Sequence, residues 1–118
     1  MNEGLSPISV FIDIENLGIK RKAAKQVKKV NKLLRHLFHG LVMLGFRAKE
    51  AVIFASLRRS YSKERSEYYQ TRVREEASNF NTQVVWSKCI ADIALISAIR
   101  ERVISGKLQK SVLIISDD

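Results

Sequence analysis

The sequence predicts a single α/β domain, residues 1–118, with a parallel sheet between two layers of helices. Four short runs rich in β-branched and aromatic residues alternate with three longer stretches of helical periodicity. Most of the runs are almost continuously apolar, which is typical of strands that helices cover on both faces. Right-handed connections between successive strands then give a three-layer α/β/α sandwich, for which we expect the strand order 3-2-1-4.

The predicted strands are ISVFIDI at 8–14, AVIFAS at 51–56, TQVVW at 82–86 and SVLIIS at 111–116. All but the third lack a regular polar alternation, so we expect the first, second and fourth to be buried on both faces. No internal repeat or linker divides the chain.

Apolar residues recur every three or four positions from Lys20 to Leu44, which predicts a helix with one buried stripe that ends at Gly45. A second, very polar helix is expected over 62–80, on the surface of the domain. Its thin inner stripe consists of Tyr69, Val73 and Ala77.

A third and more apolar helix is expected over 90–105, where Gly106 ends it. Its predicted buried stripe consists of Leu95, Ile96, Ile99 and Val103. Asp92 precedes these residues at helical spacing, which places a carboxylate on the apolar stripe.

The composition restricts the class of protein. The 118 residues include 21 Lys and Arg against 12 Asp and Glu, a formal net charge of +9, and 46% of them are hydrophobic. A chain of this kind folds and attracts anionic partners, either nucleic acid or membrane headgroups. Its single cysteine excludes an internal disulfide framework and a Cys-rich zinc site.

The sequence shows neither a targeting signal nor a long apolar stretch, which predicts a cytoplasmic protein, or a nuclear one in a eukaryote. The opening MNEGLSPIS has no basic n-region, so we expect no secretory signal. The apolar stretches fall well short of the ~20 residues that cross a bilayer, so we expect no membrane span.

The chain has only four aspartates, Asp13, Asp92, Asp117 and Asp118. Asp13 ends the first predicted strand, the last two follow the fourth strand, and Asp92 opens the third helix. Because the carboxyl ends of parallel strands share one edge of the sheet, all four are expected at that edge, where α/β sheets bind ligands.

Each aspartate also has an ordinary structural interpretation. Asp92 fits a first-turn acid favoured by the helix dipole, and Asp117 and Asp118 fit a turn after a strand. Two carboxylates about 4 Å apart repel by ~4 kcal/mol at an effective dielectric near 20, so a cluster of them needs a compensating cation. Hard oxygen ligands favour Mg²⁺ or Mn²⁺ over zinc.

Three blocks of the sequence together resemble the signature blocks of the NYN domain, a branch of the PIN-like superfamily of metal-dependent nucleases that includes LabA-like and limkain-type proteins. The blocks are VFIDIEN at 10–16, SKCIADIALI at 87–96 and VLIISDD at 112–118. They follow in the family's order and spacing over nearly the whole chain. Each block is a weak pattern by itself, and the three together are fairly specific.

The resemblance implies roles for individual residues. Asp13 would be the first metal-binding acid, and Asn16 the amide of the family's D-x-x-N block. Lys88 and Asp92 match the lysine and the acid of the second block.

In the third block, Ser116 and Asp118 match the family's serine and first acid. Asp117 stands where the family usually has glycine, so whether Asp117 or Asp118 faces the metal stays open. The family's next acid and phenylalanine would follow Asp118, so we expect the domain to lack its C-terminal portion here. The family's further acid on the third helix is replaced by Ser97 and Ala98.

By this resemblance the reaction is hydrolysis of phosphodiester bonds in RNA, with single-stranded RNA favoured and Mg²⁺ or Mn²⁺ as cofactor. The expected metal ligands and catalytic acids are Asp13, Asp92, Asp117 and Asp118, with Lys88 as a catalytic phosphate contact. The expected substrate-binding residues are Asn16, Lys20, Lys22, Ser56, Arg58, Arg59 and Ser116.

A run of bases on the first helix offers a path for an anionic polymer. Such a run is usually the solvated face of an amphipathic helix, but here no acid interrupts it between Glu15 and Glu50. The bases are Lys20, Arg21, Lys22, Lys25, Lys28, Lys29, Lys32 and Arg35. Trp86 is interpreted as core, and His36 and His39 as surface histidines.

Other functions compete with the nuclease. A catalytically inactive nucleic-acid-binding module of the same fold is the main alternative. A haloacid-dehalogenase-like phosphatase needs an aspartate two residues after Asp13, where this chain has Glu15. A dinucleotide-binding domain needs a G-x-G-x-x-G turn that is absent from the sequence. Binding to a membrane surface would leave the aspartates unexplained.

Overall fold

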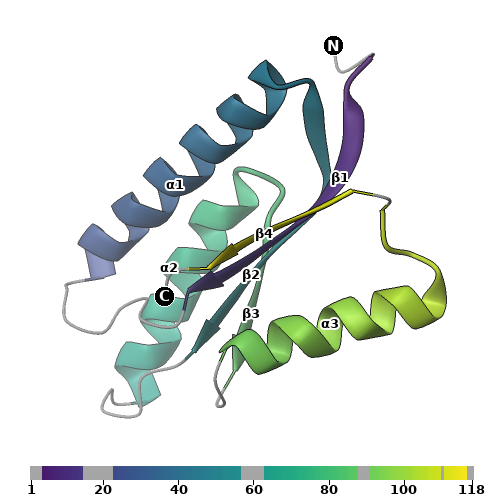
Figure 1. Cartoon of the computed structure of the whole chain (residues 1–118). Coiled ribbons are helices and arrows are strands. Elements are labelled where there is room, and N and C mark those ends of the chain that lie inside the picture. Colours follow the sequence, from purple (N-terminus) through teal and green to yellow (C-terminus); the bar gives the residue numbers. More distant parts are fainter. Residues whose placement is uncertain (1–3, 15–22, 57–62, 88–90, 110, 117–118) are drawn as a thin grey trace.

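Four parallel strands form one sheet in the order β3-β2-β1-β4, with helices on both faces (Figure 1). The computed structural model describes residues 4–14, 23–56, 63–87, 91–109 and 111–116. The predicted α/β class, parallel sheet and strand order are confirmed. The elements are β1 (Ser6–Ile14), α1 (Ala23–Met43), β2 (Phe46–Ser56), α2 (Lys63–Ser78), β3 (Gln83–Ser87), α3 (Ala91–Ser105) and β4 (Val112–Ser116).

β1 lies at the centre of the sheet and buries both of its faces. Val10 and Ile12 belong to a large apolar cluster with α1 and α2, whereas Phe11 packs on the opposite face with Leu95 of α3. All three β1 side chains are fully buried. This burial from two sides explains why the strand is almost continuously apolar.

β2 begins at Phe46, five residues earlier than expected, and pairs with the start of β1. The register shifts between Ile8 and Ser9 of β1, which pair with Ala48 and Glu50, so Lys49 is an extra residue in the ladder. Such a bulge reverses the side-chain alternation. It lets Ala48 pack in the α1 cluster while Glu50 reaches the α3 face.

Two glycines end helices as expected. Gly45 and Gly106 have φ values of +89° and +71°, a conformation that a side chain disfavours. After α3, the Lys107 amide donates to the Arg102 carbonyl at 2.9 Å, which caps the last turn.

The predicted buried stripe of α3 is half wrong. Leu95 is buried and Ile99 packs beside it, but Ile96 is 63% exposed and Val103 is 59% exposed. The buried face instead includes Ala94 and Ala98, and the guanidinium of Arg102 lies over the ring of Phe11. Among the described elements of the sheet, α3 contacts β1, β2 and β3 but not β4, and the flank of α3 that carries Ile96 and Val103 is exposed.

Arg102 joins α3 to the sheet at the end of the domain opposite the carboxyl ends of the strands. Its guanidinium forms an ion pair with Glu50 of β2, donates to the Ala98 carbonyl at 3.1 Å and lies 5.2 Å from the centre of the Phe11 ring. The two charged side chains are 22% and 29% exposed. This partial burial makes the pair more than a screened surface contact.

Replacing Arg102 with methionine should lower the free energy of unfolding by about 1–2 kcal/mol, because Glu50 then keeps its charge without its partner. Urea denaturation measures this loss. Arg100→Met, an exposed position on the same helix, is the matched control and should change stability little. Equal effects of the two substitutions would show that the Glu50 pair contributes nothing.

Candidate functional site

Asp13 is a buried carboxylate at the carboxyl end of the central strand. It is 3% exposed and is the next-to-last residue of β1. Because side chains alternate along a strand, Asp13 lies on the same face as Phe11, the face that α3 covers. Its neighbours across the sheet are Phe54 of β2 and Ser116 of β4.

This place in the sheet is the topological switch point. The chain leaves β1 through α1 on one face and enters β4 through α3 on the other, so β1 and β4 are neighbours with helices on opposite faces (Figure 1). Open parallel sheets bind ligands outside the strand ends at such a point. Asp13 and Ser116, which are paired, stand directly at it.

The start of α3 brings Asp92 to the same edge of the sheet. Leu95 of α3 packs against Phe11 and Phe54, and Asp92 precedes it by three residues, which places its backbone about 4.5 Å closer to the carboxyl ends of the strands. Asp13 lies two strand residues, about 6.6 Å, from Phe11 in the same direction. The backbone therefore places both residues beyond one apolar cluster, although the Asp92 side chain lies outside the described residues.

The other predicted site residues divide into two groups. Ser56 and Ser116 end β2 and β4 at this edge, as expected, and only their backbones are described. The remaining site residues of the sequence analysis lie outside the described residues. They are Asn16, Lys20, Lys22, Arg58, Arg59, Lys88, Asp117 and Asp118.

The described residues supply one carboxylate to the candidate metal site. Among them, no three His, Cys, Asp or Glu side chains gather closely enough to hold a metal ion. The carboxylate of Asp13 has the donor chemistry that Mg²⁺ and Mn²⁺ prefer. The rest of the expected ligand set consists of Asp92, whose side chain is not described, and of Asp117 and Asp118.

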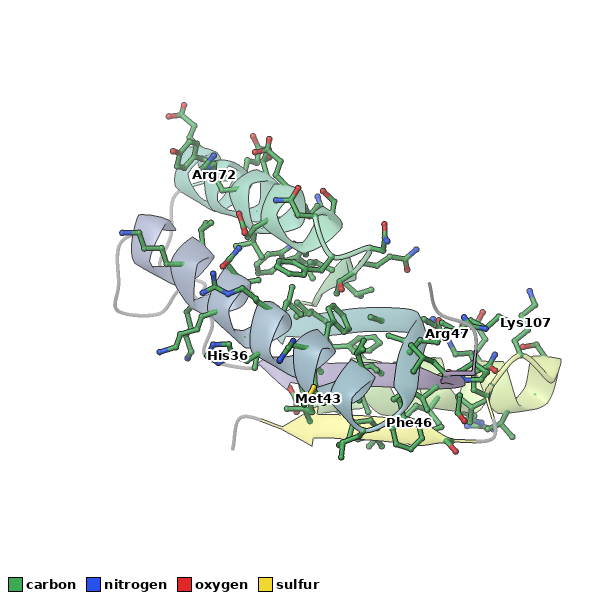
Figure 2. All side chains as sticks on the ribbon, turned by 90° about the horizontal axis from the view of Figure 1, so that it is seen from above. His36, Met43, Phe46, Arg47, Arg72 and Lys107 are labelled. Atoms are coloured by element: carbon green, nitrogen blue, oxygen red, sulfur yellow. The ribbon has the colours of Figure 1, made fainter. Side chains whose placement is uncertain are left out.

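α1 presents a basic face on the other side of the sheet. Lys28, Lys29, Lys32 and Arg35 are all exposed, and so are His36 and His39, as expected. Figure 2 shows His36 on the flank of α1 that is turned away from α2, whereas Arg72 stands on α2. Among the described residues, the two ion pairs involve only Arg72 and Arg102, so these bases of α1 are free to meet an external anion.

Trp86 of β3 packs against the core, as expected. Sequence reasoning missed that His39 continues the line of bases on α1. Its spacing of four residues from Arg35 was the available signal.

These features define a class, a doubly wound parallel α/β domain with an acid buried at its switch point. Comparison with protein-family models, with curated proteins and with solved structures gave no match. No helix within the described segments is long and apolar enough to cross a membrane.

Proposed function

We propose that the protein is a metal-dependent ribonuclease that hydrolyses phosphodiester bonds at the edge formed by the ends of β1 and β4. The observation that carries this proposal is the burial of Asp13 at the switch point, beside the first turn of α3. The resemblance of three sequence blocks to NYN domains points to the same chemistry.

In this proposal Asp13, Asp92, Asp117 and Asp118 hold Mg²⁺ or Mn²⁺, and Lys88 contacts the scissile phosphate. The metal would supply charge stabilisation for the phosphoryl oxygens and activate the attacking water. Asp13 is buried, and its register partners on the neighbouring strands are Phe54 and Ser116. Ser116, Ser56 and the bases near the strand ends position the phosphate chain.

The proposal predicts that the chain cleaves labelled single-stranded RNA with Mn²⁺ or Mg²⁺ and that a chelator stops the reaction. The products are separated on a denaturing gel. A version that continues past Asp118 with a metal-binding acid and an apolar residue is assayed beside it. If both proteins bind RNA and neither cleaves it with any metal, the nuclease proposal fails.

A catalytically inactive RNA-binding module is the second candidate. The exposed bases on α1 favour it, since they need no metal to bind phosphate. Binding that persists unchanged in a chelator, together with no cleavage, would decide for this alternative.

A further inference from the structure

Three cations of α1 form a straight row along one flank of the helix. Lys28, Lys32 and Arg35 follow one another at spacings of four and three residues, so they stand one turn apart. His39 continues the same line four residues later. With a rise of ~1.5 Å per residue, the row from Lys28 to His39 is about 16 Å long.

The row borders the groove between α1 and α2. The groove is lined by Val27, Asn31 and Glu76 together with the three cations. Glu76 is the only acid of this lining, and its carboxylate accepts a hydrogen bond from the Asn31 side chain. Within the described segments, none of the three cations forms an ion pair or hydrogen bond.

The packing of α1 favours a nucleic acid over a membrane as the partner of this row. Interfacial helices bind bilayers by burying an apolar face between lipid headgroups. The apolar face of α1 is not available for this, because Val27, Val30 and Leu34 are buried against the sheet and α2. Charge without an apolar face suits a phosphate backbone in water.

α1 begins at the same end of the domain as the candidate site, the end where the strands finish. β1 and β2 are parallel, so α1 must start at the edge where β1 ends and run back along the sheet (Figure 1). Lys28 is therefore the member of the row nearest to the carboxyl ends of the strands, and Arg35 is the farthest. A nucleic-acid strand that is bound at that edge and extends along α1 would contact Lys28 first, then Lys32 and then Arg35.

We infer that Lys28, Lys32 and Arg35, the α1 row, bind the sugar-phosphate backbone of single-stranded RNA outside the cleavage site. The identity of the polymer rests on the proposed function, whereas the row itself does not depend on catalysis. An RNA that spans the strand ends and α1 gains these contacts, and a trinucleotide held at the strand ends does not. The row thereby makes binding and KM depend on RNA length.

The test compares two double substitutions that remove equal charge. Lys32→Gln with Arg35→Gln removes two members of the α1 row. Arg74→Gln with Arg100→Gln removes two exposed bases elsewhere, one on the flank of α2 opposite Glu76 and one on α3. Binding of a labelled single-stranded RNA is followed by fluorescence anisotropy against salt, in chelator so that no cleavage occurs.

Loss of two phosphate contacts should reduce the slope of log K against log salt by about 1.4, since each contact on a single strand contributes ~0.7. Over a fourfold rise in salt, the native protein then loses about sevenfold more affinity than the α1 variant does. The control variant should keep the native slope. In cleavage assays, the α1 variant should raise KM for the long RNA and leave a trinucleotide unaffected.

The outcomes separate this inference from the proposed function. A slope change in the α1 variant alone supports the row even if no RNA is cleaved. If RNA is cleaved and both variants keep the native salt slope, the inference about the α1 row is wrong and the proposed nuclease function stands. Binding to phosphatidylserine vesicles that depends on the row, without binding to RNA, would also overturn the inference.

Discussion

Replacing Asp13 with asparagine should abolish RNA cleavage and leave RNA binding essentially unchanged. Asp13 is the one buried carboxylate among the described residues of the candidate site, and it lies at the switch point of the sheet. A metal that stabilises transition-state charge supplies several kcal/mol, and 1.36 kcal/mol corresponds to a tenfold change in rate. We therefore expect cleavage to fall by about a thousandfold or more.

Metal binding gives this prediction a second measurement that does not depend on activity. A metal present at about 100 times its Kd stabilises the folded state by about 2.7 kcal/mol. Millimolar Mg²⁺ should therefore raise the melting temperature of the native protein by several degrees and that of Asp13→Asn by much less. Equal shifts in the two proteins would show that the ion binds elsewhere.

Ser9→Ala is the matched control for Asp13→Asn. Ser9 is also buried in β1, and its hydroxyl has no hydrogen-bond partner within the described segments. Its place four residues before Asp13 puts it on the same face but far from the strand ends. The control should cleave RNA at the native rate. If Asp13→Asn instead loses RNA binding and cleavage together, Asp13 supports the structure and not the chemistry.

The sequence predicted the sheet correctly because the information lies in the strands themselves. The run at 8–14 is apolar at all positions except Ser9 and Asp13, and β1 is covered on both faces, as expected. The same expectation for the fourth strand is wrong, because Ile114 of β4 is 54% exposed. The strand order 3-2-1-4 was expected for a PIN-like sheet, since right-handed connections also allow other orders. The start of β2 could not be found in this way, because the extra residue Lys49 breaks the alternation.

The buried face of α3 was harder to predict because the helix has two apolar flanks. Leu95 and Ile96 are adjacent and equally apolar, so periodicity alone does not say which one is buried. Tertiary packing decides it, since the position of α3 over β1, β2 and β3 buries Leu95 and leaves Ile96 in solvent. Arg102 was overlooked because its inward role depends on Glu50, fifty-two residues away.

The candidate site was predictable to the extent that strand ends determine it. Asp13 could be placed at the edge because it lies at the carboxyl end of a buried strand, and the topology placed the backbone of Asp92 there as well. The mutual geometry of the carboxylates depends on residues beyond the strand ends. Asp117 and Asp118 lie outside the described residues, so their role as metal ligands stays a prediction.

Replacing Phe11 with alanine should cost about 3–5 kcal/mol of folding free energy, the usual range for a buried phenylalanine. Phe11 is fully buried, its ring centre lies 6.2 Å from that of Phe54, and it packs in the cluster with Leu95. Domains of this size are stable by about 5–15 kcal/mol, so the loss is a large share of the total. Urea denaturation measures it. Ile104→Ala, at a position 76% exposed, is the control and should cost little.

Phe11→Leu tests whether this cluster supports the candidate site. The variant keeps an apolar side chain and should therefore leave the protein folded. Phe11 and Leu95 together fix the first turn of α3, and with it Asp92, relative to Asp13. Groups that hydrogen-bond to metal ligands change metal affinity by about 10–100-fold, and a packing residue such as Phe11 should have a smaller effect. We therefore expect Phe11→Leu to raise the Mg²⁺ concentration needed for half-maximal cleavage, while the rate at saturating metal falls less. A variant that loses stability but keeps the native metal dependence would show that α3 does not position a metal ligand.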